Sequence, residues 1–282
     1  MSSFLKRALS GAVLVAVMVA AILVSVETLL LLALLITAGS VHEFFKFSFP
    51  EEKGGPGFLR HAGTVLVACL MVAVTWLVVW RGASAANYLI LLPCVFLLII
   101  FAIYNKRDCS PMKRIGVQMT ALVYIALPMS LLVALGDRAT AFDGRAYNAW
   151  LVLFYVILIW INDVGAYLVG MTFGKHRLFE RLSPKKSWEG FFGGLLFTLL
   201  AAIFLGPRVT GMENTPLWGW IIFGVVLTLS AVAGDLVESM FKREAGVKDS
   251  GSIIPGHGGL LDRFDAMFVS LPFVYVMVCL MG

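Results

Sequence analysis

Carboxylates at the ends of two apolar stretches are the residues of this sequence best suited to chemistry. The stretch that begins at residue 217 stays apolar as far as Ala233, and five polar residues follow at offsets of 0, 3, 4, 7 and 8: Asp235, Glu238, Ser239, Lys242 and Arg243. These offsets place all five on one face of a helix. The next apolar stretch opens with Asp262 and Asp265, three residues apart and again on one helical face. Two oxygen-rich helix edges without thiolates favour a hard cation such as Mg²⁺.

The connection between these stretches, residues 244–261, is rich in glycine and contains Lys248, Asp249 and His257. Gly258 and Gly259 come just before the start of a helix, where backbone N–H groups can approach a phosphate closely. Two interpretations stay open for this loop. The glycines either cradle an anion or turn the chain into the next helix, and His257 is either an acid or base or a hydrogen-bonding residue at the helix start.

A second loop, residues 174–189, concentrates basic side chains: Lys175, His176, Arg177, Arg181, Lys185 and Lys186. Two interpretations stay open for this loop: it contacts lipid headgroups as a positive-inside loop, or its residues 183–186, Ser-Pro-Lys-Lys, form a rigid basic turn aimed at phosphates. The sequence contains no GxxxxGK[ST] pattern, so a nucleotide would be bound in another way. Asp163, in the preceding apolar stretch, is either a structural partner of a basic residue or part of the site.

The composition identifies the elements that must position these residues. Of the 282 residues, 60% are hydrophobic and 14% charged, and the mean hydropathy is +0.92. Such values exclude a water-soluble domain, a disordered chain and a disulfide scaffold, and the four cysteines have no metal-ligand spacing. Windows of about 20 apolar residues therefore predict an all-α polytopic membrane protein with about nine spans. The predicted spans are 8–24, 28–41, 62–80, 87–104, 116–136, 149–171, 189–206, 217–240 and 263–281.

Basic residues assign an orientation to these spans. With the N-terminus in the cytoplasm, 18 of the 22 Lys and Arg residues fall on the inner side, and the outer side has Arg81, Arg138, Arg145 and Arg208. This asymmetry predicts a protein integral to the cell (inner) membrane whose active site faces the cytoplasm. The net charge of +5 follows from this topology, so no nucleic-acid partner is expected. We expect residues 1–150 to be a transmembrane scaffold and residues 151–282 to hold the catalytic site.

Residues 239–265 resemble, without a gap over 27 residues, the signature of the phosphatidate cytidylyltransferase family, the CDP-diacylglycerol synthases. The matching positions include the Lys-Arg pair at 242–243, the Lys-Asp pair at 248–249 and the His-Gly-Gly run that begins at 257. Residues 234–239 are similar to the family's GDLxES segment, and residues 165–190 resemble a further family block. Val164 departs from the family, which commonly has Ser or Thr at that position.

The resemblance implies an enzyme that joins phosphatidate and CTP to give CDP-diacylglycerol and pyrophosphate, with Mg²⁺ as cofactor and K⁺ as a candidate second cation. It implies metal ligation by Asp235 and Asp262, with Asp249 and Asp265 as second candidates. The basic side chains expected to bind phosphates are those of Lys242, Arg243, Lys248 and Arg263. The expected substrate-binding set also includes Ser183, Lys185, Lys186, Ser239, His257, Gly258 and Gly259. The family further suggests a homodimer in contact with membrane lipid.

Two other functions stay open on the residues alone. A secondary transporter would use Asp163, Asp235 and Asp262 as a cation or proton relay. Against it, the two halves show no internal repeat, and the carboxylates gather at one membrane face. A related membrane transferase would use another nucleotide or another lipid alcohol, because the sequence contains no base-reading motif that selects CTP.

Overall fold

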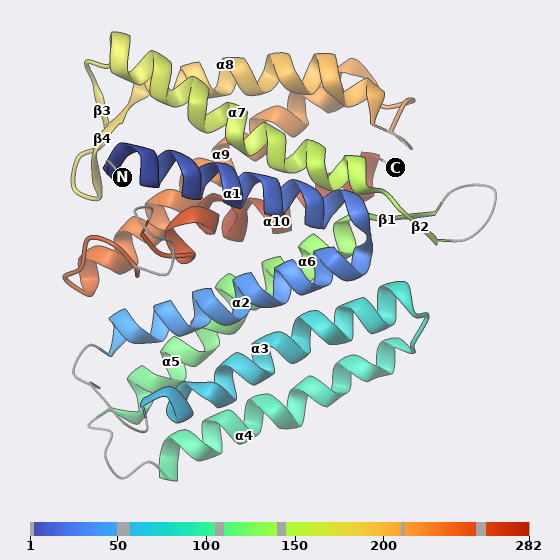
Figure 1. Cartoon of the computed structure of the whole chain (residues 1–282), viewed down its shortest axis with the longest axis vertical. Coiled ribbons are helices and arrows are strands. Elements are labelled where there is room, and N and C mark those ends of the chain that lie inside the picture. Colours follow the sequence, from blue (N-terminus) through green and yellow to red (C-terminus); the bar gives the residue numbers. More distant parts are fainter. Residues whose placement is uncertain are drawn as a thin grey trace. The chain divides into compact units, whose positions relative to one another are not determined.

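The computed structural model describes residues 3–49, 57–104, 110–139, 145–209, 212–251 and 258–281, and helices dominate them (Figure 1). The α-helices are α1 (Ser3–Val24), α2 (Val26–Ser48), α3 (Gly57–Trp80), α4 (Leu91–Tyr104), α5 (Pro111–Ala121), α6 (Leu127–Leu135), α7 (Ala149–Phe173), α8 (Trp188–Leu205), α9 (Leu217–Glu244) and α10 (Leu261–Met281). Shorter helical turns are η1 (Ala85–Ile90), η2 (Leu122–Ala126) and η3 (Gly206–Arg208). Two small hairpins pair β1 (Asp137–Ala139) with β2 (Arg145–Tyr147), and β3 (Arg177–Phe179) with β4 (Ser183–Ser187).

Among the described residues, eight helical stretches are long and apolar enough to cross a membrane, and Leu9–Val24 is a shorter apolar helix. The predicted all-α polytopic fold with about nine spans is thereby confirmed. Several helices are longer than the predicted spans; among them α2 reaches Ser48 and α9 reaches Glu244. Glu43 and the polar residues 235–243 therefore belong to helices. The cytoplasmic position of the N-terminus stays a prediction.

A single residue, Ser25, separates α1 from α2. The Ser25 hydroxyl accepts a hydrogen bond from the Thr28 N–H at 3.2 Å, and the Thr28 hydroxyl accepts one from the Ser25 N–H at 3.1 Å. This reciprocal pair is a capping box, which satisfies backbone N–H groups at the start of α2. The first two apolar stretches are consequently two separate helices.

The chain divides into two compact units, of which the first comprises residues 1–137 and 249–263. In this unit α2 packs against α1, α3 and α6, and α3 also packs against α4 (Figure 1). Leu29, Ala33 and Ile36 of α2 are buried at helical spacing and form part of the core. The part of the glycine-rich loop that begins at Asp249 belongs to this same unit. The predicted roles of residues 1–150 as scaffold and 151–282 as catalytic region stay predictions.

The second unit comprises residues 138–248 and 264–282, and glycines let its helices approach closely. In α8, a Cβ atom on Gly194 would lie 2.7 Å from Asn162 Oδ1 of α7. At the contact of α9 with α10, a Cβ atom on Gly234 would lie 2.5 Å from the Asp265 carbonyl oxygen and 3.0 Å from Ala266 Cα. Only a residue without a side chain fits such a contact. The close approach brings Asp235, the residue after Gly234, next to Asp265.

The basic segment 183–186 is a strand, so the interpretation of these residues as a rigid turn is wrong. It lies in β4, which pairs antiparallel with β3 so that Arg177 is opposite Ser187 and Phe179 is opposite Ser183. Backbone pairing with β3 satisfies N–H and C=O groups that an isolated turn would leave to water. Ser187 then caps α8, since its hydroxyl accepts a hydrogen bond from the Gly190 N–H at 3.1 Å.

Candidate active site

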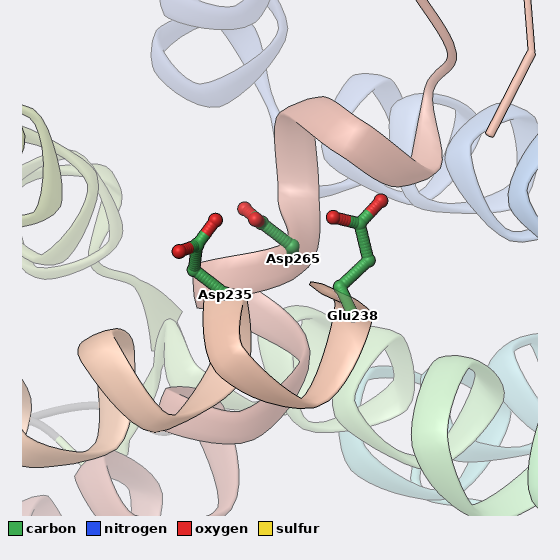
Figure 2. Close-up of side chains that lie close together, drawn as sticks. All are labelled: Asp235, Glu238 and Asp265. Carbon is green, nitrogen blue, oxygen red and sulfur yellow. The ribbon is translucent and has the colours of Figure 1, made fainter. Parts of the chain in front are cut away.

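Three carboxylates of the second unit converge where α9 meets α10. Asp235 and Glu238 are one helical turn apart on α9, and Asp265 of α10 lies between them (Figure 2). One carboxylate oxygen from each of the three residues lies within 4.8 Å of the other two. This convergence depends on the contact at Gly234, because any side chain there would collide with the backbone of Asp265. Oxygen ligands at this spacing suit a hard divalent cation.

Two lysines neutralise part of this acidic cluster. Lys186 of β4 forms an ion pair with Asp235, and Lys242 forms one with Glu238 at 2.5 Å, one turn further along α9. The Glu238 side chain is only 1% exposed, so its charge depends on such a partner. The ion pairs therefore place one ammonium group against Asp235 and one against Glu238.

Asp163 of α7 lies near the same cluster. Lys186 and Asp235 both act on it electrostatically. The sequence left open whether Asp163 is a structural partner or part of the site, and the structure places it among the charged groups around Asp235. The neighbouring Val164 is exposed.

The hairpin that presents Lys186 is held at its base by Glu189 of α8. This carboxylate accepts hydrogen bonds from the Lys175 N–H at 3.1 Å and the His176 N–H at 3.2 Å, and it contacts His176 Nδ1 at 2.6 Å. Acceptors in the first turn of a helix are also favoured by the helix dipole. Glu189 thus connects the residues just before β3 to the start of α8, which directly follows β4.

Asp262, which was predicted as a metal ligand, accepts hydrogen bonds from backbone N–H groups of the first unit. Its Oδ2 accepts hydrogen bonds from the Ser250 N–H and the Gly259 N–H, both at 3.0 Å. The second bond resembles the acidic half of a capping box at the start of α10. Gly258 precedes it with a φ of +84°, a left-handed conformation that glycine adopts without strain. The Gly259 N–H, which we expected to face a phosphate, is thus engaged by Asp262.

The other predicted residues fall into three groups. Side chains on the surface are Lys185, Arg243, Lys248, Asp249 and Arg263. Ser183 and Ser239 are half-buried. His257 lies outside the described residues. Their proposed contacts with substrate or metal stay predictions.

Glu238 was not predicted from the sequence as a metal ligand, nor was Glu43 predicted as a supporting residue. Glu238 had a usable signal, because its offset of three from Asp235 places it on the same helical face. Glu43 of α2 had none, since its partners are Ser250 and Leu261, more than 200 residues away in the chain.

Comparison with known proteins supports the resemblance seen in the sequence. The pattern that describes the Cytidylyltransferase family matches residues 5–281. A phosphatidate cytidylyltransferase of Staphylococcus haemolyticus is 30% identical over 272 residues, which cover 96% of this chain and 98% of that protein. A phosphatidate cytidylyltransferase of Staphylococcus aureus is 33% identical over 225 residues, covering 79% of each chain.

Proposed function

Because this chain belongs to the cytidylyltransferase family, we propose that it transfers CMP from CTP to phosphatidate, giving CDP-diacylglycerol and pyrophosphate. The observation that supports this most directly is the cluster of Asp235, Glu238 and Asp265 with Lys186 and Lys242 beside it. Nucleotidyl transfer brings anionic reactants together and releases an anionic product. A site with both carboxylates for a cation and ammonium groups for phosphates meets these needs.

In the reaction a phosphate oxygen of phosphatidate attacks the α-phosphorus of CTP. A new P–O bond forms, the bond from the α-phosphorus to the β,γ-pyrophosphate breaks, and the electron pair of that bond leaves with pyrophosphate. The attacking phosphate is largely ionised near neutral pH, so this scheme needs no general base. The residues of this chain therefore act by binding and orientation rather than by proton transfer.

Asp235, Glu238 and Asp265 would hold Mg²⁺, which when bound supplies positive charge that orients and screens the reacting phosphates. Lys186 and Lys242 would bind phosphate oxygens beside that ion; their ion pairs with Asp235 and Glu238 support this role. Arg243, Lys248, Asp249 and Arg263 complete the proposed set, as the family signature implies. Asp262 as a metal ligand and K⁺ as a second cation rest on the family resemblance.

The eight apolar helical stretches indicate a multi-pass membrane protein. We place the reaction at the cytoplasmic boundary of the inner membrane, where the headgroup of phosphatidate and soluble CTP can meet. The asymmetric distribution of Lys and Arg supports this orientation. A homodimer is part of the proposal on the family resemblance alone.

The test is conversion of labelled CTP by the purified full chain in detergent micelles containing phosphatidate, with Mg²⁺ or with a chelator. We expect lipid-linked CMP and pyrophosphate in equal amounts, and neither product without phosphatidate or Mg²⁺. Parallel assays with dCTP, UTP and diacylglycerol distinguish this reaction from that of a related transferase. Folded protein that forms no product with any of these substrates would overturn the proposal and favour the transporter.

A further inference from the structure

Glu43, near the C-terminal end of α2, is a buried carboxylate that contacts the glycine-rich loop. Glu43 is only 1% exposed to solvent. Its Oε2 accepts hydrogen bonds from the Leu261 N–H at 2.9 Å and from the Ser250 hydroxyl at 3.3 Å. Ser250 and Leu261 lie on opposite sides of the glycine-rich segment, so one carboxylate oxygen joins the two ends of that segment.

Two glycines of the loop make room for this carboxylate. A Cβ atom on Gly251 would collide with Glu43 Oε1 and lie 2.6 Å from Glu43 Cδ. A Cβ atom on Gly259 would collide with the Ser250 hydroxyl and Glu43 Oε2, and would lie 2.8 Å from Glu43 Cδ. Both glycines are therefore required by packing around Glu43, whatever their relation to a phosphate.

Asp262, which directly follows the segment, contacts both of its ends as well. Its Oδ2 accepts from the Ser250 N–H and the Gly259 N–H, as described above. Ser250 therefore donates its N–H to one carboxylate and its hydroxyl to another, 12 residues and 207 residues away in the chain respectively. All these groups lie in one compact unit of the structure.

We infer that Glu43 is a positioning residue for cytidylyl transfer, which acts by holding the ends of the glycine-rich segment together. The segment and its flanks include Asp249, Asp262 and Arg263, which the family signature relates to metal and phosphate binding. This inference rests on the proposed function, because a positioning role needs a reaction to position for. It also gives residues of the N-terminal region a part in the chemistry beyond that of a scaffold.

The first experiment compares Glu43→Ala and Glu43→Gln in the full chain, with Glu27→Ala as matched control. Glu27 is an acidic residue of the same helix, but its side chain is 54% exposed and pairs with Arg81 at 3.5 Å. We expect Glu43→Ala to lower kcat at least tenfold. Glu43→Gln should keep kcat within about threefold of wild type, because an amide oxygen still accepts hydrogen bonds from Leu261 and Ser250. Glu27→Ala should match wild type.

The second readout is amide hydrogen exchange in peptides that contain Ser250 or Leu261. Glu43→Ala should speed exchange in these peptides while those of α7 and α8 keep the wild-type rate. Wild-type kcat in Glu43→Ala, or a uniform increase of exchange across the chain, would overturn the positioning role. If Glu43→Ala fails to fold, Ser250→Ala serves instead, with an expected three- to tenfold loss of kcat; unchanged kcat there would also overturn the inference.

A double variant provides a further check. Because Glu43 and Ser250 act through one contact, Glu43→Ala combined with Ser250→Ala should lose less activity than the product of the two single losses, and a fully multiplicative loss would contradict the shared contact. Product formation by wild-type protein tests the proposed function separately. Wild type without transfer activity would refute that function. If the wild type is active and Glu43→Ala has the same kcat, only this inference would be refuted.

Discussion

Replacement of Gly234 by alanine tests whether the α9–α10 contact creates the acidic cluster. The new Cβ would lie 2.5 Å from the Asp265 carbonyl oxygen and 3.2 Å from Asp265 C, both backbone atoms that cannot rotate away. Carbon atoms in ordinary contact stay about 3.5 Å apart, so the two helices must separate locally by roughly 1 Å. Overpacking of this kind costs about 1–3 kcal/mol of stability.

The larger effect should fall on catalysis. The oxygens of Asp235, Glu238 and Asp265 now lie within 4.8 Å of one another, and Asp265 is on the helix that must move. A displacement of about 1 Å in a catalytic site can lower the rate on the order of 100-fold. We therefore expect kcat/KM of Gly234→Ala to fall about 100-fold, equivalent to ~2.7 kcal/mol of transition-state stabilisation.

Gly224→Ala is the matched control, because it makes the same change on the same helix. There the new Cβ would lie 2.9 Å from Leu199 Cδ2, the end of a flexible side chain that can rotate. CMP transfer to phosphatidate would be measured for both variants, with thermal unfolding in the same detergent. Gly224→Ala should stay within about threefold of wild type. Equal activity of folded Gly234→Ala and wild type would refute the dependence of the cluster on this glycine.

Further predictions concern charge, the hairpin and the outer surface. Asp235→Asn should reduce turnover below about 1% of wild type, because it removes both a proposed metal ligand and the partner of Lys186, and added Mg²⁺ should not restore it. Asp262→Asn should also abolish turnover, because it removes the charge while its amide oxygen preserves the bonds to Ser250 and Gly259. Full activity with unchanged hydrogen exchange in the loop would limit Asp262 to a structural role. Glu189→Ala should lower kcat/KM about tenfold and speed proteolysis of the β3–β4 hairpin, and an unaltered cleavage pattern would contradict the support assigned to this carboxylate. Arg138→Ala, on the predicted outer side, should leave CMP transfer unchanged, and a large loss in folded protein would contradict the topology.

The helices were predictable because each is a long apolar window, and the shared face of Asp235 and Glu238 followed from helical geometry. The partner of these carboxylates on α10 was harder to predict. Asp262 and Asp265 have the same residue type and are one turn apart, so the sequence cannot rank them. In the structure, the contact at Gly234 brings the turn of α10 that contains Asp265 against α9.

The β3–β4 hairpin and Glu43 show two other limits of the sequence. Residues 183–187, Ser-Pro-Lys-Lys-Ser, have neither the alternating pattern nor the β-branched residues that indicate a strand, so only pairing with β3 defines it. Glu43 lies beyond the predicted span 28–41, and its contacts join residues separated by 207 and 218 positions. Contacts of this kind are set by tertiary packing and leave no local pattern.

The ion pairs of Lys186 and Lys242 also bear on the enzyme between turnovers. Without a bound cation, the ammonium groups of Lys186 and Lys242 lie against Asp235 and Glu238 as counter-ions. The repulsion between the carboxylates is then partly compensated by these two positive charges. Loss of the metal should therefore stop turnover without unfolding the protein, so the enzyme can wait in its folded state for the next nucleotide and its cation.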